Sequence, residues 1–415
     1  MVDKVKGVRD FTGRKAFIRQ QVLETIRKTY ELFGFEPIET PAFEYLSLFT
    51  DKSGPEIESQ LYSFEDKKGE KLALRPEHTV SKLRVVSSDK SLIFPLKAYS
   101  IGNVWRYDDV RKGRWREFIQ ADIDVFGSPS IFYDSEIIAC IDFALKKIGV
   151  KGYIINVSNR KILTSLMQTL ELKIEDIIQV LREIDKIHKV GLEEVITKIT
   201  AIIGVEKAEK IKEYLSGSDI SHLNGFDELT TLISDLKKSY GIDNVIFDRS
   251  LVRGQDYYDG TIFEFEFTEG KFKGVVMAGG GRYDKLSKNF DSDLQIVGGA
   301  IGFDVIMETI LENDKNEFQK SFCVINIDSV EKARDITMKL REAGIVTDVL
   351  LDKVSLSKGL DYCNSKKIKF AIIVGDRDIQ EGKITVRDLD AKKDIKLDIT
   401  NLEKELLKII SYNPQ

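Results

Sequence analysis

Basic side chains are crowded into residues 106–116, where they outnumber the acidic ones. The basic residues are Arg106, Arg111, Lys112, Arg114 and Arg116, and the acidic residues are Asp108 and Asp109. Since a planar guanidinium group binds two phosphate oxygens at once, such a segment is suited to holding a nucleotide. The alternative is that these side chains form the solvated tip of a hairpin.

The residues that follow favour the nucleotide interpretation. Side chains alternate between the two faces of an extended strand. One face would carry Arg116, Phe118, Gln120, Asp122 and Asp124, and the other would carry Glu117 and Ile119. A cation, a ring, an amide and carboxylates make a poor hydrophobic core and a good floor for a ligand pocket.

Three other segments combine chemically useful side chains with glycines or with the start of a helix. In residues 251–260, Arg253 and two tyrosines form either a ligand-binding turn or a packed surface cluster. In residues 277–284, three successive glycines form either a hairpin turn or a backbone cradle, and no Walker loop is present. In residues 74–79, Glu77 either receives an ammonium group or caps a helix from the surface.

These segments fall on a pattern of strands with helices on either side. Apolar spacing predicts a helix over residues 14–33, and Gly34 follows it. Alternating runs at 97–106 and 118–126 predict an antiparallel hairpin, whose long loop is the arginine-rich segment. Helices are predicted at residues 131–148 and through most of 161–240, the second stretch as an insertion. Strands are predicted again at residues 244–248, 260–267 and 275–277.

The pattern of predicted strands and helices changes near residue 321, after a polar linker at residues 313–320. Short apolar strands at residues 322–327, 345–351 and 370–374 alternate with helices. Residues 328–331 (Asp-Ser-Val-Glu) resemble a capping box at the start of the first helix. Strands that alternate with helices predict a separate α/β domain with a parallel sheet.

Composition and charge narrow the class of protein. The chain has 415 residues, of which 32% are charged, and no apolar run approaches the roughly 18 residues that a membrane span requires. The first residues do not resemble a signal peptide, so we expect a cytoplasmic protein. The net charge of −5 argues against a purely electrostatic nucleic-acid binder but permits an enzyme with a local basic patch for RNA. The three cysteines are far apart, as expected for packing residues.

In their order along nearly the whole chain, these segments resemble histidyl-tRNA synthetases, which are class II aminoacyl-tRNA synthetases. Residues 6–11 (Lys-Gly-Val-Arg-Asp-Phe) resemble the N-terminal signature of that family, and residues 33–41 resemble motif 1, whose proline lies at a dimer interface. The arginine-rich hairpin resembles motif 2. Residues 253–258 (Arg-Gly-Gln-Asp-Tyr-Tyr) and 278–284 (Ala-Gly-Gly-Gly-Arg-Tyr-Asp) resemble the two histidine-specific motifs.

The resemblance implies an α+β fold. An antiparallel-sheet catalytic domain would span residues 1–320, with a helical insertion at about 161–240, and an α/β anticodon-binding domain would span 321–415. It also implies a histidine–tRNA ligase that activates histidine with ATP and Mg²⁺ and transfers it to the 3′ end of tRNA(His). The expected assembly is a homodimer, with no membrane association.

The resemblance further implies a role for each matching residue. Arg106 and Arg253 are the expected catalytic residues, acting at the α-phosphate. The expected ATP-binding residues are Arg106, Asp108, Arg114 and Phe118, with Phe118 on the adenine ring. The expected histidine-binding residues are Glu77, Thr79, Gln120, Asp124, Arg253, Tyr257, Tyr258 and Tyr283. Among these, Glu77 and Gln120 would contact the α-ammonium group, and Asp124 and Tyr258 the imidazole nitrogens. No protein ligand for a metal is implied.

The sequence departs from the family pattern at three positions. Motif 3 reads Asp304-Val305 where the family has Glu-Arg, so the arginine that holds the γ-phosphate is missing. Asp108 replaces a glutamate, and His78 stands where glycine is frequent. We hypothesise that Arg114 supplies the missing cation. The rival interpretation is an inactive paralogue that binds histidine as a regulatory subunit of histidine biosynthesis, and a plain RNA-binding protein is a more distant one.

Overall fold

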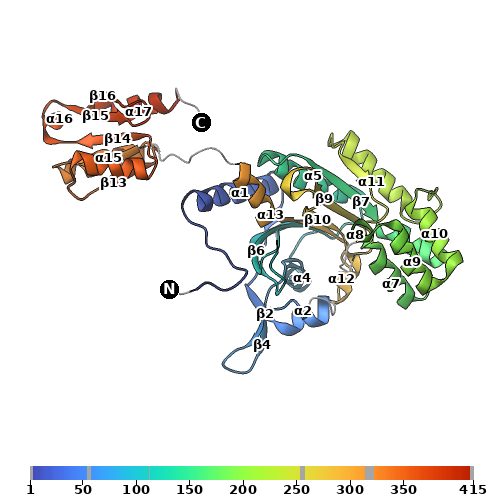
Figure 1. The fold of residues 1–415 in the computed structure, drawn as a ribbon. Helices are drawn as coiled ribbons and strands as arrows, with labels where there is room; N and C mark the ends of the chain where they lie inside the picture. Colours follow the sequence, from blue (N-terminus) through green and yellow to red (C-terminus); the bar gives the residue numbers. More distant parts are fainter. Residues whose placement is uncertain (1–2, 54–57, 112, 253–257, 314–321, 412–415) are drawn as a thin grey trace. The chain divides into compact units, whose positions relative to one another are not determined.

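The computed structural model describes residues 3–53, 58–111, 113–252, 258–313 and 322–411 (Figure 1). The chain divides into two units, residues 1–313 and 314–415. Two of the expected site residues, Arg253 and Tyr257, lie outside the described residues, as does most of the expected linker. No described helix combines the length and the apolar character that a membrane crossing needs.

An eight-stranded sheet forms the centre of the first unit, in the order β1-β5-β6-β11-β10-β9-β7-β8. Its strands are β1 (Glu36–Pro37), β5 (Leu96–Trp105), β6 (Glu117–Phe126), β7 (Tyr153–Asn159), β8 (Val245–Phe247), β9 (Thr261–Phe267), β10 (Val276–Arg282) and β11 (Ile296–Gly302). All neighbours are antiparallel except the pairs β1–β5 and β7–β8. The β5–β6 pair confirms the predicted hairpin, and it joins Leu96 to Phe126 and Trp105 to Glu117.

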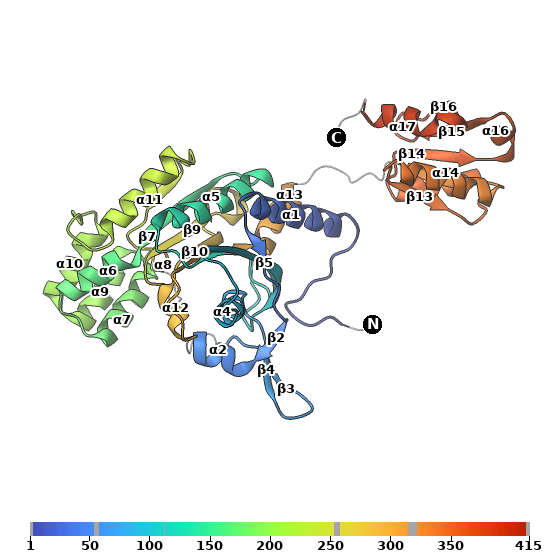
Figure 2. The ribbon, with the colours of Figure 1, turned by 180° about the vertical axis from the view of Figure 1, so that it is seen from behind.

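Helices cover both faces of this sheet. On one face lie α1 (Gly13–Leu32), α5 (Ile131–Lys147) and α13 (Phe303–Asn313), whose apolar side chains join the main core. The other face curves around α4 (Thr79–Ser88), as Figures 1 and 2 show, and α12 (Asp284–Lys288) lies beside it. Leu83 and Val86 of α4 pack there on Ala98, Phe126 and Ile262. The start of α4 therefore lies against the polar face of β6.

A small sheet and a helical insertion complete this unit. The small sheet has the order β2-β4-β3, with β2 (Phe43–Tyr45), β3 (Ser63–Glu65) and β4 (Lys71–Leu74), and α2 (Leu46–Ser53) follows β2. Between β7 and β8 lie α6 (Arg160–Thr169), α7 (Ile174–Ile184), α8 (Ile187–Val190), α9 (Leu192–Ile203), α10 (Val205–Leu215) and α11 (Phe226–Lys238). A short 3-10 helix, η1 (Gly270–Phe272), connects β9 and β10.

The second unit has a five-stranded mixed sheet of order β13-β12-β14-β15-β16. Its elements are β12 (Phe322–Asn326), α14 (Val330–Glu342), β13 (Thr347–Leu350), α15 (Leu356–Ser365), β14 (Phe370–Val374), α16 (Asp376–Gln380), β15 (Lys383–Asp388), β16 (Lys393–Asp398), η2 (Ile399–Asn401) and α17 (Leu402–Ser411). The prediction of a parallel sheet is right for β13, β12 and β14 and wrong for the antiparallel hairpin of β15 and β16. The predicted capping box is also wrong. Ser329 forms no side-chain cap, and Asp328 Oδ1 instead accepts the Asp376 N–H at 2.9 Å.

A buried carboxylate at the start of α13 joins the N-terminal segment to the sheet. Asp304 is 2% exposed, and its Oδ1 accepts Arg9 Nη2 at 2.5 Å and Arg19 Nη1 at 2.6 Å. Its Oδ2 accepts the backbone N–H of Ile119 in β6 at 2.8 Å. The Arg9 guanidinium lies 3.6 Å from the centre of the Trp115 ring. Asp304 thus holds the N-terminal segment, α1, β6 and α13 together.

The substitution Asp304→Ala should lower the free energy of unfolding of this unit by about 3–5 kcal/mol, because it leaves the buried guanidinium group of Arg19 without its carboxylate and removes one of the two carboxylates of the half-buried Arg9. Both tryptophans, Trp105 and Trp115, belong to this unit, so urea unfolding followed by tryptophan fluorescence reports on it. Glu194→Ala removes the exposed partner of Lys198 and serves as the control, with an expected change within about 0.5 kcal/mol. Equal unfolding midpoints for the two variants would contradict this role of Asp304.

Candidate active site

Most of the expected histidine-binding residues line one cavity of about 110 Å³ above the middle of the sheet. The lining residues are Glu77, Thr79, Arg106, Gln120, Asp122, Asp124, Tyr258, Gly279, Tyr283, Gly298, Gly299 and Ala300. Two buried oxygens in this lining, Gln120 Oε1 and Asp122 Oδ1, have no hydrogen-bond partner among the described residues. Because buried polar atoms are almost always paired, these two indicate a place for a ligand.

Glu77 caps a helix and also lines the cavity, and its binding of an ammonium group stays a prediction. One carboxylate oxygen accepts the Val80 N–H at 2.9 Å and the other accepts the Thr79 N–H, so Glu77 caps α4. The expectation of a surface carboxylate is wrong, since Glu77 is 6% exposed and lines the cavity. Burial raises the pKa of this carboxyl above its usual value, against the opposing effect of the backbone N–H groups. A ligand ammonium group would favour its ionised form.

Asp124 lies at the bottom of the cavity between two donors. The Tyr283 hydroxyl donates to its Oδ1, and Lys82 Nζ forms an ion pair with its Oδ2. Lys82 comes from α4 and is fully buried. Sequence reasoning missed Lys82, because no signal distinguishes it from a solvated lysine before the apolar neighbours Val80 and Leu83 are placed in the core.

Asp122 is a second carboxylate that the expected site residues did not include, although it lies on the predicted polar face of β6. It is 3% exposed, and burial is the main cause that raises its pKa to about 7. The neighbouring carboxylates Asp124 and Glu77 raise this pKa further, whereas Lys82 and Arg106 lower it. Asp122 therefore changes its charge near neutral pH.

The glycines of β10 and β11 make room for the cavity. The expectation of a hairpin turn is wrong, because Gly279, Gly280 and Gly281 lie within β10 and pair with β9 and β11. A Cβ at Gly280 would collide with the backbone of β11. A Cβ at Gly298 would collide with the side chains of Asp124 and Tyr283. The second expected role, a backbone that closely approaches a ligand, agrees with this packing.

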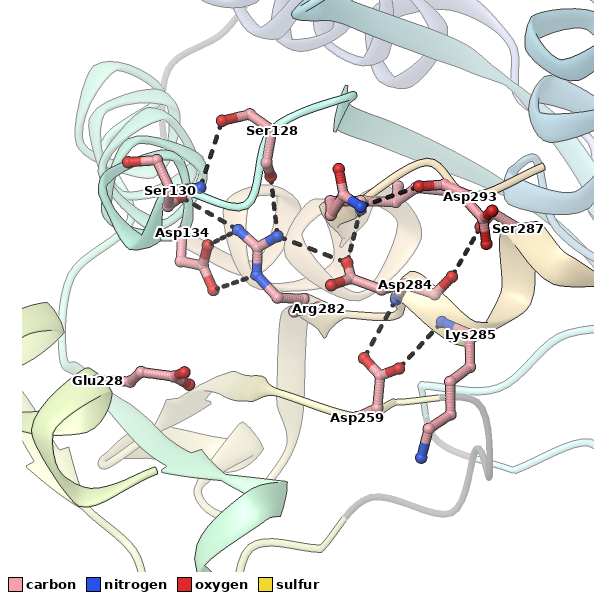
Figure 3. A network of polar contacts seen from close by, with 12 residues as sticks. Ser128, Ser130, Asp134, Glu228, Asp259, Arg282, Asp284, Lys285, Ser287 and Asp293 are labelled. Atoms are coloured by element: carbon pink, nitrogen blue, oxygen red, sulfur yellow. Dashed lines mark hydrogen bonds and ion pairs between the residues drawn. The ribbon is translucent and has the colours of Figure 1, made fainter. Parts of the chain in front are cut away.

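A network around Arg282 holds the tyrosine side of the cavity in place (Figure 3). The Arg282 guanidinium is buried, pairs with Asp134 and donates to the carbonyl oxygens of Ser128 at 3.0 Å and Ser130 at 3.1 Å. The adjoining Asp259 accepts the N–H of Asp284 at 3.1 Å and that of Lys285 at 2.9 Å. Tyr283 directly follows Arg282, and Tyr258 directly precedes Asp259. The network therefore fixes the backbone positions of both tyrosines.

The expected ATP-binding residues lie in the loop that connects β5 to β6 and at the start of β6. Arg106 Nε donates to the Pro76 carbonyl at 2.8 Å, and its guanidinium lies 5.3 Å from the centre of the Phe118 ring. Arg114 Nη1 and Asp108 Oδ2 form an ion pair at 3.1 Å. Asp108, Arg114 and Phe118 do not line the cavity of Glu77, whereas Arg106 does. Arg106 is therefore the cation that connects the loop to the cavity.

The tip of the arginine-rich loop lies beside the position of the missing motif 3 arginine. A Cβ at Gly113 would lie 3.9 Å from Val305 Cγ2 and 3.7 Å from Val275 Cγ1. Within the described residues, no cluster of three or more His, Cys, Asp and Glu side chains could hold a metal ion. The loop itself carries Arg106, Arg111, Arg114 and Arg116, whose guanidinium groups can bind phosphate oxygens.

A mostly antiparallel sheet, a polar cavity on it, an arginine-rich hairpin and a mixed α/β C-terminal unit together define a class II aminoacyl-tRNA synthetase. Comparison with known protein families shows which synthetase family within this class the chain matches. The model for histidyl-tRNA synthetase matches residues 7–310, and the model for the anticodon-binding domain matches residues 321–409. The chain belongs to the histidyl-tRNA synthetase family.

Individual relatives are similar to this chain over nearly the whole length of both sequences. The histidine–tRNA ligases of Thermoplasma volcanium and Pyrococcus abyssi are each 32% identical over 99% of this chain and 100% of their own. The crystal structure of histidyl-tRNA synthetase from Nostoc sp. PCC 7120 has the same fold, with a TM-score of 0.85 at 24% identity, covering 98% of this chain and 99% of that chain. A Bacillus halodurans structure described as an ATP phosphoribosyltransferase regulatory subunit/histidyl-tRNA synthetase has a TM-score of 0.75 at 23% identity, covering 88% of this chain and 96% of its own.

The substitution Asp124→Asn should raise the KM for histidine by at least about tenfold, the scale of one hydrogen bond to a charged group. The KM for ATP should change little, because Asp124 is buried and lies six residues along β6 from Phe118, an expected ATP-binding residue. Steady-state exchange kinetics with each substrate varied in turn measure both values. Asp142→Asn alters another buried carboxylate, which accepts the Tyr153 hydroxyl at 2.7 Å outside the cavity, and is the control. A rise in the KM for ATP alone would show that Asp124 does not bind the amino acid.

Proposed function

We propose that this chain is a histidine–tRNA ligase. It joins histidine to ATP, forming histidyl-adenylate and pyrophosphate, and then transfers the histidyl group to the 3′ end of tRNA(His). The single observation that carries this proposal is the cavity, where Glu77, Gln120, Asp124 and two tyrosines lie within reach of Arg106. The family membership and the match of the C-terminal unit to an anticodon-binding domain support the second step.

The cavity offers a partner for each polar group of histidine. Glu77 and Gln120 would bind the α-ammonium group, with Thr79 beside them. Asp124 would accept a ring N–H, and the Tyr258 hydroxyl would donate to the other ring nitrogen. This arrangement leaves buried polar groups unpaired when an apolar amino acid enters, which gives strong selection without an editing step.

Adenylate formation brings together two anionic groups, the carboxylate of histidine and the α-phosphate of ATP. A carboxylate oxygen of histidine attacks the α-phosphorus of ATP, and the bond to the pyrophosphate oxygen breaks as the new bond forms. Arg106, at the rim of the cavity, would stabilise the α-phosphate, and Arg253 is proposed to do so from the other side. Such fixed cations act by position and charge. Mg²⁺ enters with ATP as part of the nucleotide substrate, and Phe118 is the proposed adenine platform, with Asp108 at the adenine edge.

Attack by a hydroxyl of the terminal adenosine on the adenylate carbonyl then releases AMP and completes the transfer. The C-terminal unit is proposed to bind the anticodon, as the name of its matching model indicates. Since charged tRNA is used in translation, we propose a cytoplasmic location for this ligase.

A second copy of the chain is the proposed partner. A groove of about 590 Å³ lies along the edge strand β1, lined by Arg27, Glu31, Thr40 and Arg75 among others. Its polar and charged lining and the exposed Leu32 nearby support a homodimer that uses the motif 1 segment. Sedimentation equilibrium of the full chain tests this proposal, and a monomer at micromolar concentration would count against it.

The regulatory paralogue is the second candidate, and the observation in its favour is Val305. Without the motif 3 arginine, a protein could bind histidine and fail to hold the triphosphate. Histidine-dependent exchange of labelled pyrophosphate into ATP separates the two functions. A chain that binds histidine and shows no exchange would be the regulatory protein.

The position of Gly113 beside Val305 leads to a prediction about the γ-phosphate. The Arg114 side chain is half-exposed, and within the described residues its guanidinium group pairs with Asp108 at 3.1 Å, so it can turn towards a triphosphate that enters the loop. Arg114→Ala should raise the KM for ATP by at least about tenfold, the scale of one charge-assisted hydrogen bond. Introducing arginine at position 305 in the Arg114→Ala background should recover part of the loss. The KM for histidine is the internal control, and an unchanged KM for ATP would exclude Arg114 from this role.

The two units predict a separation of the two reaction steps. A chain that ends at residue 313 keeps every described residue that lines the cavity, so it should retain pyrophosphate exchange within about threefold. It should lose most tRNA charging. Circular dichroism and sedimentation confirm folding and assembly of the shortened chain. Full charging activity by that chain would refute the proposed role of the C-terminal unit.

A further inference from the structure

Lys82 is a buried cation that the proposed reaction does not use. Its side chain is fully buried in the first unit, and its ammonium group forms an ion pair with Oδ2 of Asp124. Asp124 is itself 2% exposed, and its other oxygen accepts the Tyr283 hydroxyl. Burial of a lysine is costly unless the charge is paired. The ion pair therefore places a compensating positive charge at the end of the cavity where the histidine ring would bind.

The remaining charged and titratable groups near Lys82 come from five parts of the chain. On β6, Asp122 has a pKa raised to about 7 by burial. Before α4, His78 has a pKa lowered to about 3 by burial and by Lys82 and Arg75, so it is neutral. Glu77 and Arg106 line the amino-acid and phosphate ends of the cavity. Tyr283 donates to Asp124, and Tyr258 lines the same cavity, with its ring centre 6.0 Å from that of Tyr283.

We infer that Lys82 is a specificity-determining residue that makes the cavity select histidine with a neutral imidazole ring. This inference rests on the proposed histidine-binding function. Asp124 still has lone pairs for a ring N–H, since a carboxylate accepts more than two hydrogen bonds. An imidazolium ring would carry a second positive charge close to the Lys82 ammonium, and like charges in a poorly solvated cavity repel strongly. In the ion pair, the Asp124 carboxylate can still accept a hydrogen bond from the imidazole ring. The Lys82 ammonium group cancels the negative charge of that carboxylate, so the pair does not attract a charged ring.

Without Lys82, the same cavity would have the opposite preference. Asp124 would then be an uncompensated carboxylate next to Asp122, and a nearby cation favours ionised carboxylates. A protonated imidazole would be the cation that the cavity lacks. Lys82→Met keeps the length of the side chain and removes its charge, whereas Lys82→Arg keeps the charge.

Calorimetry of histidine binding to the full chain between pH 7.5 and 5.5 tests the inference. A site for the neutral ring loses severalfold in affinity at pH 5.5, since the imidazole ring of free histidine is mostly protonated at that pH. The unmodified chain and Lys82→Arg should show this loss, and in two buffers of different ionisation enthalpy they should release protons on binding at pH 6. Lys82→Met should show neither effect. Lys146→Met removes another lysine that pairs with a buried carboxylate, Asp142, and should behave like the unmodified chain.

A histidine analogue with a triazole ring, which takes up no proton in this range, gives a test that needs no variant. Its affinity for the unmodified chain should not change between pH 7.5 and 5.5. A decline as large as that of histidine would place the titrating group on the protein, with Asp122 the nearest candidate, and would overturn the inference. Equal proton release by Lys82→Met and the unmodified chain would overturn it as well. Absence of histidine-dependent pyrophosphate exchange by the unmodified chain would instead be a failure of the proposed function.

Discussion

The ion pair of Lys82 with Asp124 is the interaction on which the site depends, because it joins two elements that carry the amino-acid cavity. Lys82 belongs to α4, whose first residues and their cap supply Thr79 and Glu77, and Asp124 belongs to the centre of β6. The Tyr283 hydroxyl adds the end of β10 to the same carboxylate. Three elements that are far apart in the sequence therefore converge on one buried group, and the cavity lies where they meet.

Because three elements converge on Asp124, the neighbouring strands β10 and β11 must leave space above the sheet. The carboxylate of Asp124 and the phenol of Tyr283 fit above the sheet only because β11 has no side chain at position 298. The glycines of these strands meet that demand, since a Cβ at Gly298 would occupy the space of Asp124 and Tyr283. Glycine weakens a strand, so other interactions must hold these strands in place. The buried Arg282–Asp134 pair at the end of β10 is one of them.

The sequence allowed much of the fold and part of the site to be predicted. The hairpin of β5 and β6 and the helix α1 followed from apolar periodicity, which reports directly on which face is buried. Gln120 and Asp124 followed from alternation along a strand. Lys82 did not, because its burial results from the contact of α4 with β6, a long-range property that a lysine in a short helix does not signal. The hairpin of β15 and β16 was missed although its residues alternate, because the preceding strand–helix rhythm favoured a parallel sheet.

At the two positions that resemble motif 3, this chain keeps an acidic residue and lacks an arginine. In the family pattern an acidic residue and an arginine stand side by side, and here Asp304 retains the acidic position whereas Val305 has no charge. The structure gives Asp304 a purely structural task, since it binds Arg9, Arg19 and the N–H of Ile119. That task needs the carboxylate at the start of α13 and is independent of its neighbour. A chain can therefore keep this anchor and lose the arginine, provided that another cation reaches the triphosphate. Gly113 of the arginine-rich loop lies close to Val305, since a Cβ at Gly113 would be 3.9 Å from Val305 Cγ2.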